Sequence, residues 1–495
     1  MTRSERGLLL LVPALALACA HWQPNPRLQE VRPQEGYRFA ALQAPGNSDS
    51  LFVVLSFSGG GTRAAALSYG LLEQLRRTSI VWKGETKPLL AEVDVISSVS
   101  GGSFTSLDYA LRGEGTFADF ESRFLKADIQ GALARQVLLP WNWFRLASPT
   151  FDRSDLAAEH YDRFVFDGRS YGDLEAAAKR PFVIVNATDM TVGARFEFTQ
   201  DQFDPLCSDL SGVPLARAAA ASSAVPGLLS PLTLRSYAAE RCGFAKPGWY
   251  ESARLDPYEV NPRRFLDAER LDLYLAPEKR YVHLVDGGVS DNIGLRGPLH
   301  ALVSLDSPWS LQRLIDLRRV EKVVVLAANA KTGGVPTFDR QENAPHLLSV
   351  LQSSAGAPMA HYSFETVERV RNERDLDEQL QRTVADCNEL LRGCGAPPVP
   401  GELQPVDFYV VEVGFDALAD AGQRAFFKGL PTSFRLPAVT VDCLRSVAGR
   451  VLVEAGDYQR LLDDLEAAAR AAGVAPPTRA PAPAVPAACG ASGPG

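Results

Sequence analysis

Three short motifs carry residues that could act together on a carbonyl group. The run SGGGTR at residues 58–63 is rich in glycine, so its backbone amides could converge on an anion at the start of a helix. In SVSGGS, at residues 98–103, Ser100 stands between small residues, as a nucleophile does on a tight strand-to-helix turn. In DGG, at residues 286–288, the carboxylate of Asp286 is followed by glycines that admit close approach of a backbone. A glycine-rich loop of this kind could cradle a phosphate or form an oxyanion hole, and a serine on such a turn could act as a nucleophile.

Each motif follows a predicted buried strand, so all three could open onto one edge of one sheet. Short apolar runs predict six strands, at residues 51–55, 93–96, 182–185, 281–285, 323–326 and 408–411. Helical patterns lie between them, including residues 64–76 and a closing amphipathic helix at 458–472. This alternation predicts an α/β fold with a mainly parallel sheet. Asp286, at the end of an expected parallel strand, lies where such sheets place their ligands.

The order of the three motifs resembles that of the patatin-like phospholipases. Further similar segments are NATD at 186–189, AAASSAVPG at 219–227 and DGGVSDN at 286–292. The likeness covers roughly residues 51–295 and continues more loosely to about Val451. It implies a three-layer α/β fold with helices on both faces of a mainly parallel sheet, together with loop and helical insertions.

The resemblance also implies roles for single residues. Ser100 matches the nucleophile and Asp286 its partner in a two-residue dyad. The oxyanion loop corresponds to Gly59, Gly60 and Gly61, and the supporting residues are Arg63, Gly102, Gly287 and Gly288. The chain departs from the family pattern at Ser98, which replaces the first glycine of the nucleophile turn, and at Ala64, which replaces a glycine after the oxyanion loop. Both replacements are small, so we expect activity to survive.

Other mechanisms and another class of function stay open at this point. A Ser-His-Asp triad could use His300, His346 or His361, which follow Asp286 as in α/β-hydrolases. His283 is three residues from Asp286 on a strand, where odd separations point to opposite faces. The acyl acceptor could be another lipid instead of water. A catalytically silent envelope lipoprotein could use the same fold to bind lipid or a partner.

The first 19 residues have the pattern of an export signal. Arg3 and Arg6 precede an apolar run at residues 8–17, which is too short to span a membrane. Cys19 follows small residues, as in the lipobox of bacterial lipoproteins, although Ala16 stands where leucine is usual. We therefore expect an exported protein of the bacterial cell envelope, anchored to a membrane through Cys19 in the outer membrane or periplasm, or otherwise secreted.

The other six cysteines suit disulfides in an oxidising compartment. They are Cys207, Cys242, Cys387, Cys394, Cys443 and Cys489. The sequence does not determine the pairing, but Cys387 and Cys394 are the easiest to join because the loop between them is short. No cysteine and histidine cluster has zinc spacing, so we expect no metal. A Ser-Asp dyad needs no organic cofactor either.

The 495 residues divide into one large domain with extensions. We expect a linker at 20–50, a catalytic domain at 51–472 and a disordered Pro/Ala-rich tail at 473–495. Insertions are expected near residues 117–167 and 236–279. The first insertion contains the apolar cluster of Leu138, Leu139, Trp141, Trp143 and Phe144. Such a cluster predicts core packing more often than a lid that touches lipid.

Charge and hydropathy exclude two classes of protein. The 51 Lys and Arg against 59 Asp and Glu give a formal net charge of -8, which disfavours nucleic acid as a partner. The mean hydropathy of -0.07 excludes a polytopic membrane protein. The partners expected from the resemblance are a phospholipid or other acyl-ester lipid and a membrane surface.

Overall fold

The structure is a computed structural model that describes residues 20–43, 45–316, 318–333, 342–343, 347–397 and 406–490. Its centre is an eight-stranded sheet. The strands of this sheet are β1 (Leu51–Phe57), β4 (Val93–Val99), β5 (Phe182–Asp189), β6 (Ala194–Glu197), β7 (Leu232–Arg235), β8 (Tyr281–Asp286), β9 (Lys322–Asn329) and β10 (Asp407–Gly414). A separate hairpin joins β2 (Ser79–Trp82) to β3 (Glu85–Pro88).

The strand order in the sheet is β10-β9-β1-β4-β5-β8-β7, and β6 pairs with β5. Strands β10, β9, β1, β4 and β5 run parallel to one another. Every residue of β1, β4, β5 and β9 is buried, which explains why these strands are continuous apolar runs. All six strands that the sequence predicts are present.

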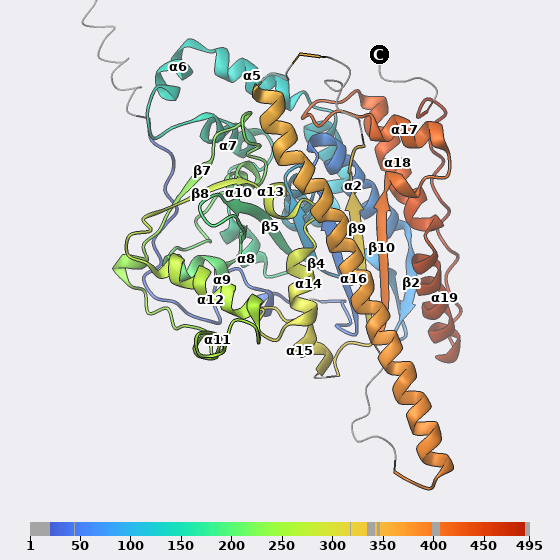
Figure 1. Ribbon diagram of the computed structural model, residues 1–495. Coiled ribbons are helices and arrows are strands. Elements are labelled where there is room, and N and C mark those ends of the chain that lie inside the picture. Colours follow the sequence, from blue (N-terminus) through green and yellow to red (C-terminus); the bar gives the residue numbers. More distant parts are fainter. Residues whose placement is uncertain are drawn as a thin grey trace, which may run out of the picture.

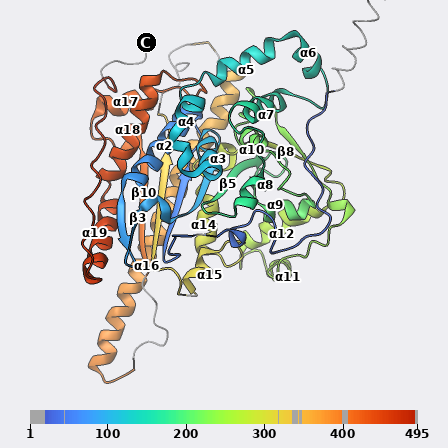
Figure 2. The same ribbon diagram turned by 180° about the vertical axis from the view of Figure 1, so that it is seen from behind.

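Helices cover both faces of this sheet. The α-helices are α2 (Gly61–Arg77), α3 (Gly101–Arg112), α4 (Thr116–Phe120), α5 (Ile129–Leu138), α6 (Pro140–Leu146), α7 (Arg153–Phe164), α8 (Tyr171–Ala177), α9 (Gln200–Phe203), α10 (Leu215–Ser222), α11 (Tyr250–Leu255), α12 (Pro262–Leu275), α13 (Gly288–Asp291), α14 (Arg296–Val303), α15 (Leu311–Asp316), α16 (Leu347–Gly393), α17 (Ala421–Lys428), α18 (Ala438–Glu454) and α19 (Gly456–Ala471). Figures 1 and 2 show α14 and α16 on one face, and α2, α3 and α18 on the other. The three-layer α/β fold expected from the sequence is therefore confirmed.

Strand β8 corrects one expectation, because it is antiparallel to β5 and not parallel. The chain enters β8 from β7, with which it also pairs antiparallel. Asp286, Val285 and Leu284 of β8 pair with the last three residues of β5, at positions 187–189. Because the overlap is confined to the end of β5, Asp286 still lies near the carboxyl edge of the sheet, close to the end of β4.

The segment expected to be a linker packs against the body of the domain. Its aromatic residues Trp22, Tyr37 and Phe39 are buried, together with Leu42. The hydroxyl of Tyr37 accepts a hydrogen bond of 2.9 Å from the N–H of Val183 in β5. The apolar surface of these rings is buried against the domain. The sequence suggested a linker because most other residues of the segment are polar.

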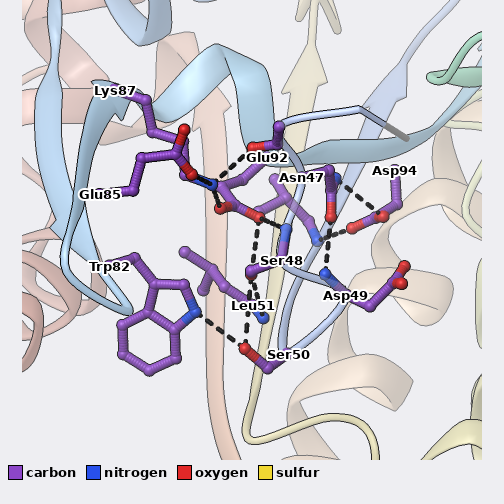
Figure 3. Close-up of polar contacts among 12 residues, drawn as sticks. Asn47, Ser48, Asp49, Ser50, Leu51, Trp82, Glu85, Lys87, Glu92 and Asp94 are labelled. Carbon is purple, nitrogen blue, oxygen red and sulfur yellow. Dashed lines mark hydrogen bonds and ion pairs between the residues drawn. The ribbon is translucent and has the colours of Figure 1, made fainter.

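The end of this segment is fixed at the amino-terminal edge of the sheet (Figure 3). The N–H and hydroxyl of Ser48 both donate to the carboxylate of Glu92, which also pairs with Lys87. The indole N–H of Trp82 donates to the hydroxyl of Ser50 at 2.9 Å. The residues directly before β1 are therefore held by a network of hydrogen bonds and an ion pair, and they do not form a flexible linker.

The C-terminal tail also differs from the expected disordered state over residues 473–490, which the structure describes. Cys489 is buried and forms a disulfide with Cys443 of α18, while Cys207 pairs with Cys242. Cys387 and Cys394, which the sequence makes the easiest pair to join, are not joined: both thiols are free and exposed. Six helical residues, 388–393, lie between these two positions and separate them by about 10 Å, which is beyond the Cα distance of a disulfide.

Both predicted insertions are helical. Residues 117–167 hold α5, α6 and α7, and residues 236–279 hold α11 and α12, whose contacts form a small separate core. Within the described residues, the structure contains no helix that is both long and apolar enough to cross a membrane.

Candidate active site

Ser100 occupies the turn between β4 and α3 in a conformation that few side chains adopt. Its φ is 49° and its ψ is -120°. Such a strained turn projects a nucleophilic hydroxyl away from the backbone. The two glycines that follow it are needed for space, because a Cβ on Gly101 would lie 2.1 Å from the carbonyl oxygen of Gly61. A Cβ on Gly102 would lie 2.7 Å from the Cβ of Phe57.

Ser98 fits the position where the family pattern has glycine. The residue is buried, and its hydroxyl accepts a hydrogen bond of 2.7 Å from Ser106 of α3. The same hydroxyl donates to the carbonyl of Ile184 at 3.3 Å. The extra polar group is therefore paired inside the protein, where an unpaired hydroxyl would be costly.

The register of the sheet brings Asp286 to Ser100. Val99 pairs with Asn186 of β5, and Ala187, the next residue of β5, pairs with Asp286. Ser100, which follows Val99, therefore reaches the same level of the sheet as Asp286. Figure 1 shows β5 between β4 and β8, with α13 beginning directly after β8.

The carboxyl of Asp286 is buried, and its pKa is raised. The N–H of Gly288 donates to its Oδ1 at 2.8 Å. Burial raises its pKa to about 6, and hydrogen bonds from the Gly288 N–H and the Ser100 hydroxyl act in the opposite direction. Gly287 must lack a side chain, because a Cβ there would lie 2.2 Å from the carbonyl oxygen of Asn186. A carboxylate with such a pKa is ionised at neutral pH and is more basic than an exposed aspartate.

Ser222 joins the two sides of the site, and sequence reasoning assigned it no role. Its hydroxyl accepts the N–H of Ser100 at 2.8 Å and donates to the carbonyl of Asn186 at 2.6 Å. Its own carbonyl accepts the N–H of Gly287 at 3.1 Å. The one available signal was its place in the segment AAASSAVPG, between strands that carry the other motifs.

The glycine loop presents two amides and not three. The N–H of Gly59 donates to the carbonyl of Asn292 at 2.9 Å, so this amide is already occupied. Gly60 and Gly61 have φ values of 141° and 60°, which favour glycine. Among the described residues, neither of their N–H groups has a hydrogen-bond acceptor. Gly101, in the first turn of α3, packs against Gly61, and its N–H likewise has no acceptor among the described contacts.

Arg63 supports the glycine loop from within the protein. Its guanidinium donates to the carbonyls of Ala330 and Leu430 at 2.9 and 2.8 Å, and to the hydroxyl of Thr432 at 3.0 Å. Burial lowers its pKa to about 10, so it remains charged at neutral pH. Arg63 thus connects the start of α2 to segments more than 260 residues further along the chain, and it lies behind the loop.

The described histidines do not enter this arrangement. The ring of His283 lies beside the hydroxyl of Thr233 at 3.1 Å and faces solvent, as the strand alternation predicted. His300 is on α14, where burial lowers its pKa. His346 lies outside the described residues, and the side chain of His361 is not described. Among the described polar contacts of Asp286, none is with a histidine.

Ser100 and Asp286 are almost covered, with 4% and 3% of their surfaces exposed. In the part of the chain that is described, no cluster of three histidine, cysteine or acidic residues could hold a metal ion. The residues present are a hydroxyl on a strained turn, a basic carboxylate and unpaired backbone amides. This set can supply nucleophilic attack, proton transfer and stabilisation of an oxyanion.

Comparison with known proteins identifies one family. Residues 55–299 match the family model described as patatin-like phospholipase, with which the α/β fold agrees. No curated protein matches the chain. Human GIVD cytosolic phospholipase A2 is 14% identical over 62% of this chain and 48% of its own, so the match spans about half of that chain, with a TM-score of 0.31. VipD from Legionella pneumophila is 10% identical over 92% of both chains, with a TM-score of 0.22.

Proposed function

We propose that the protein is a serine lipid acyl hydrolase of the phospholipase A or lysophospholipase type. One observation carries the proposal: Ser100 sits on a strained strand-to-helix turn at the same level of the sheet as the buried carboxyl of Asp286. The match of residues 55–299 to the patatin-like phospholipases supports a phospholipid or other acyl-ester lipid as the substrate.

The residues of the site suggest how the reaction proceeds. The Oγ of Ser100 attacks the ester carbonyl carbon while the Asp286 carboxylate takes the hydroxyl proton. The amides of Gly60 and Gly61, joined by that of Gly101, stabilise the oxyanion of the tetrahedral intermediate. Asp286 then returns the proton to the departing alcohol, leaving an acyl group on Ser100. Water releases the fatty acid in the reverse sequence, and Asp286 again accepts and returns a proton.

Ser100 is almost fully buried, which would limit its access to substrate. The second candidate function is therefore that of a catalytically silent, lipid-binding protein. A fluorophosphonate probe separates the two functions. We expect labelling of the purified protein that Ser100→Ala abolishes, and release of fatty acid from phospholipid in mass-spectrometric profiling. A correctly folded protein that neither labels nor releases fatty acid would contradict hydrolysis, whereas transfer of the acyl group to a lipid alcohol would identify an acyltransferase.

Histidine variants distinguish the dyad from a triad. We expect His300→Ala, His346→Ala and His361→Ala each to keep esterase turnover within severalfold, because Asp286 can serve as the base. If any one of these variants loses as much turnover as Ser100→Ala, the dyad is excluded and a Ser-His-Asp mechanism is favoured.

The proposal also includes export to the bacterial cell envelope and lipid on Cys19. The signal pattern of residues 1–19 and the two disulfides support an oxidising compartment outside the cytoplasm. Metabolic labelling with a fatty acid should mark the wild-type chain and the control Cys387→Ala, but not Cys19→Ala. Equal labelling of all three would contradict lipid on Cys19.

A further inference from the structure

The helices α5 and α6 carry large apolar side chains on the surface of the molecule. Leu138, Trp141, Trp143 and Phe144 expose 68%, 54%, 57% and 44% of their surfaces. This corrects the expectation that the tryptophan cluster belongs to the core. We refer to these four residues as the α5–α6 patch. Large exposed apolar patches mark interaction sites in proteins, and tryptophan favours the lipid–water interface.

The patch is held in place by its own polar contacts. The indole N–H of Trp143 donates to the carbonyl of Val137 at 2.9 Å, and the buried side chain of Asn142 donates to the carbonyl of Gln136 at 2.8 Å. These bonds join α6 to the end of α5 across the short connection between them. These bonds fix the turn between α5 and α6. Little side-chain entropy is therefore lost when the exposed rings bind another surface.

Charge around the patch favours a phospholipid surface. The 23 residues from Ile129 to Phe151 contain two arginines, Arg135 and Arg145, and no aspartate or glutamate. The chain as a whole has a net charge of -8. Arg145 pairs with Glu159, and Arg135 lies 3.9 Å from Asp128. The segment itself therefore adds no negative charge that would repel phosphate headgroups.

Ala20, the first residue that the structure describes, lies close to the α5–α6 patch. The carbonyl of Ala20 accepts hydrogen bonds from the hydroxyls of Ser148 and Thr150, which directly follow α6. The N–H of Trp22 also donates to the carbonyl of Thr150 at 2.7 Å. Ala20 therefore lies close to the end of α6, which is at the upper end of the molecule in Figure 1, and the proposed lipid would be carried by the residue bonded to Ala20.

The helical hairpin formed by α5 and α6 begins close to the candidate active site. Gln130, in the first turn of α5, accepts a hydrogen bond of 2.8 Å from the hydroxyl of Ser433. The carbonyl of Ser433 in turn accepts the N–H of Thr62, and Ser433 forms a bridge with Gly61 of the glycine loop. One direct chain of contacts therefore connects the hairpin to the loop at the carboxyl edge of the sheet.

From these observations we infer that the α5–α6 patch docks the protein on the interface of a phospholipid bilayer. The inference rests on the proposed function, because docking here would hold the carboxyl edge of the sheet, with Ser100, toward the membrane. It adds a surface and an orientation that neither the family match nor the dyad supplies.

Binding is tested apart from catalysis, in a background of Ser100→Ala. The chain begins at position 19 with Cys19→Ser, which retains all described residues and removes the lipid. We expect Trp141→Ser/Trp143→Ser to lower co-sedimentation with phosphatidylcholine vesicles at least about tenfold, because two large apolar side chains are lost. The matched control, Leu255→Ser/Val260→Ser, removes the exposed side chains of a different face and should bind normally.

The outcomes that overturn the inference are distinct. Unchanged binding of the tryptophan variant, or an equal loss in the Leu255→Ser/Val260→Ser control, would show that the patch does not dock. Should the double variant unfold, Trp141→Ser alone is used, since Trp141 makes no described hydrogen bond. Quenching of tryptophan fluorescence by brominated lipid provides a second measurement. Quenching that persists in the variant would also refute docking through these rings.

Activity measurements, made on chains that retain Ser100, separate this inference from the proposed function. We expect the tryptophan variant to hydrolyse a monomeric short-chain ester as wild type does, but to lose about tenfold on vesicles. Loss on both substrates with a native fold would contradict a docking role. If the wild-type chain hydrolyses neither substrate, the proposed function fails, while the binding experiment still decides the docking surface.

Discussion

Asp286 sets the pH at which the proposed dyad works. The carboxylate must be ionised to accept the proton of Ser100, and burial raises its pKa to about 6. Below this pH the protonated form predominates, so activity should fall as the pH decreases through 6. We expect kcat/KM for a short-chain ester to be about tenfold lower at about pH 5 than on the plateau above about pH 7. A profile that stays flat across this range, with circular dichroism unchanged, would exclude Asp286 as the base.

At the scale of single residues, the sequence predicted the candidate pair of Ser100 and Asp286 but not all the contacts of the site. Ser100 and Asp286 could be predicted because each stands in a short motif after a strand. The state of the Gly59 amide could not be, since its acceptor is the carbonyl of Asn292, far along the chain. The role of Ser222 is hidden for the same reason, because a serine in an alanine-rich helix carries no local signal.

The contact between the two turns is the critical feature at the scale of elements. Gly101 in α3 packs on Gly61 in α2, where a Cβ would lie 2.1 Å from a backbone oxygen. Gly101→Ala must therefore displace the glycine loop and should lower kcat by about 10²- to 10³-fold, the cost of losing one oxyanion donor. Gly115→Ala is the matched control, because its nearest neighbour, Arg112, would be 3.5 Å away. Equal kinetics of the two variants, both with native melting curves, would contradict this view of the loop.

The helix α16 shows where local sequence distance misleads. Cys387 and Cys394 suggested a short disulfide loop, but the last turns of α16 lie between Cys387 and Cys394, which follows the helix end, and keep the two thiols apart. Both should therefore react with a maleimide in the native protein, as measured by peptide mass spectrometry. The control is internal: Cys207 and Cys443 should react only after reduction, because both are in disulfides. Protection of Cys387 and Cys394 in the native, unreduced chain would contradict their exposure.

The sheet was predictable because buried parallel strands are continuous apolar runs, as β1 and β9 show. The direction of β8 was not, because strand composition does not encode direction. Direction follows from the connection through β7, which has only four residues and little apolar signal. The error did not displace Asp286, since β8 overlaps only the last three residues of β5.

Over the whole molecule, both terminal segments close against the domain, and each lies at a disulfide. The N-terminal segment bonds through the N–H groups of Leu28 and Val31 to the carbonyls of Cys207 and Cys242, which are joined to each other. Composition predicted a linker and a disordered tail, because a few aromatic residues and one cysteine hardly change the average composition of these segments. The order of these segments depends on long-range contacts that no local window contains.

The C-terminal disulfide gives this view a quantitative test. Cys443 and Cys489 are 46 residues apart, and the tail between α19 and Cys489 has little apolar surface to hold it. Its other described contacts include the partly exposed ion pairs of Arg479 with Asp463 and Glu466, which contribute little, and the packing of Val485 against the core. Most of the restraint should therefore come from the bond itself. In urea unfolding without reductant, Cys443→Ser/Cys489→Ser should lose about 2–4 kcal/mol. The control Cys387→Ser/Cys394→Ser, which removes two free thiols, should lose almost nothing; equal losses in the two variants would mean that the bond does not restrain the tail.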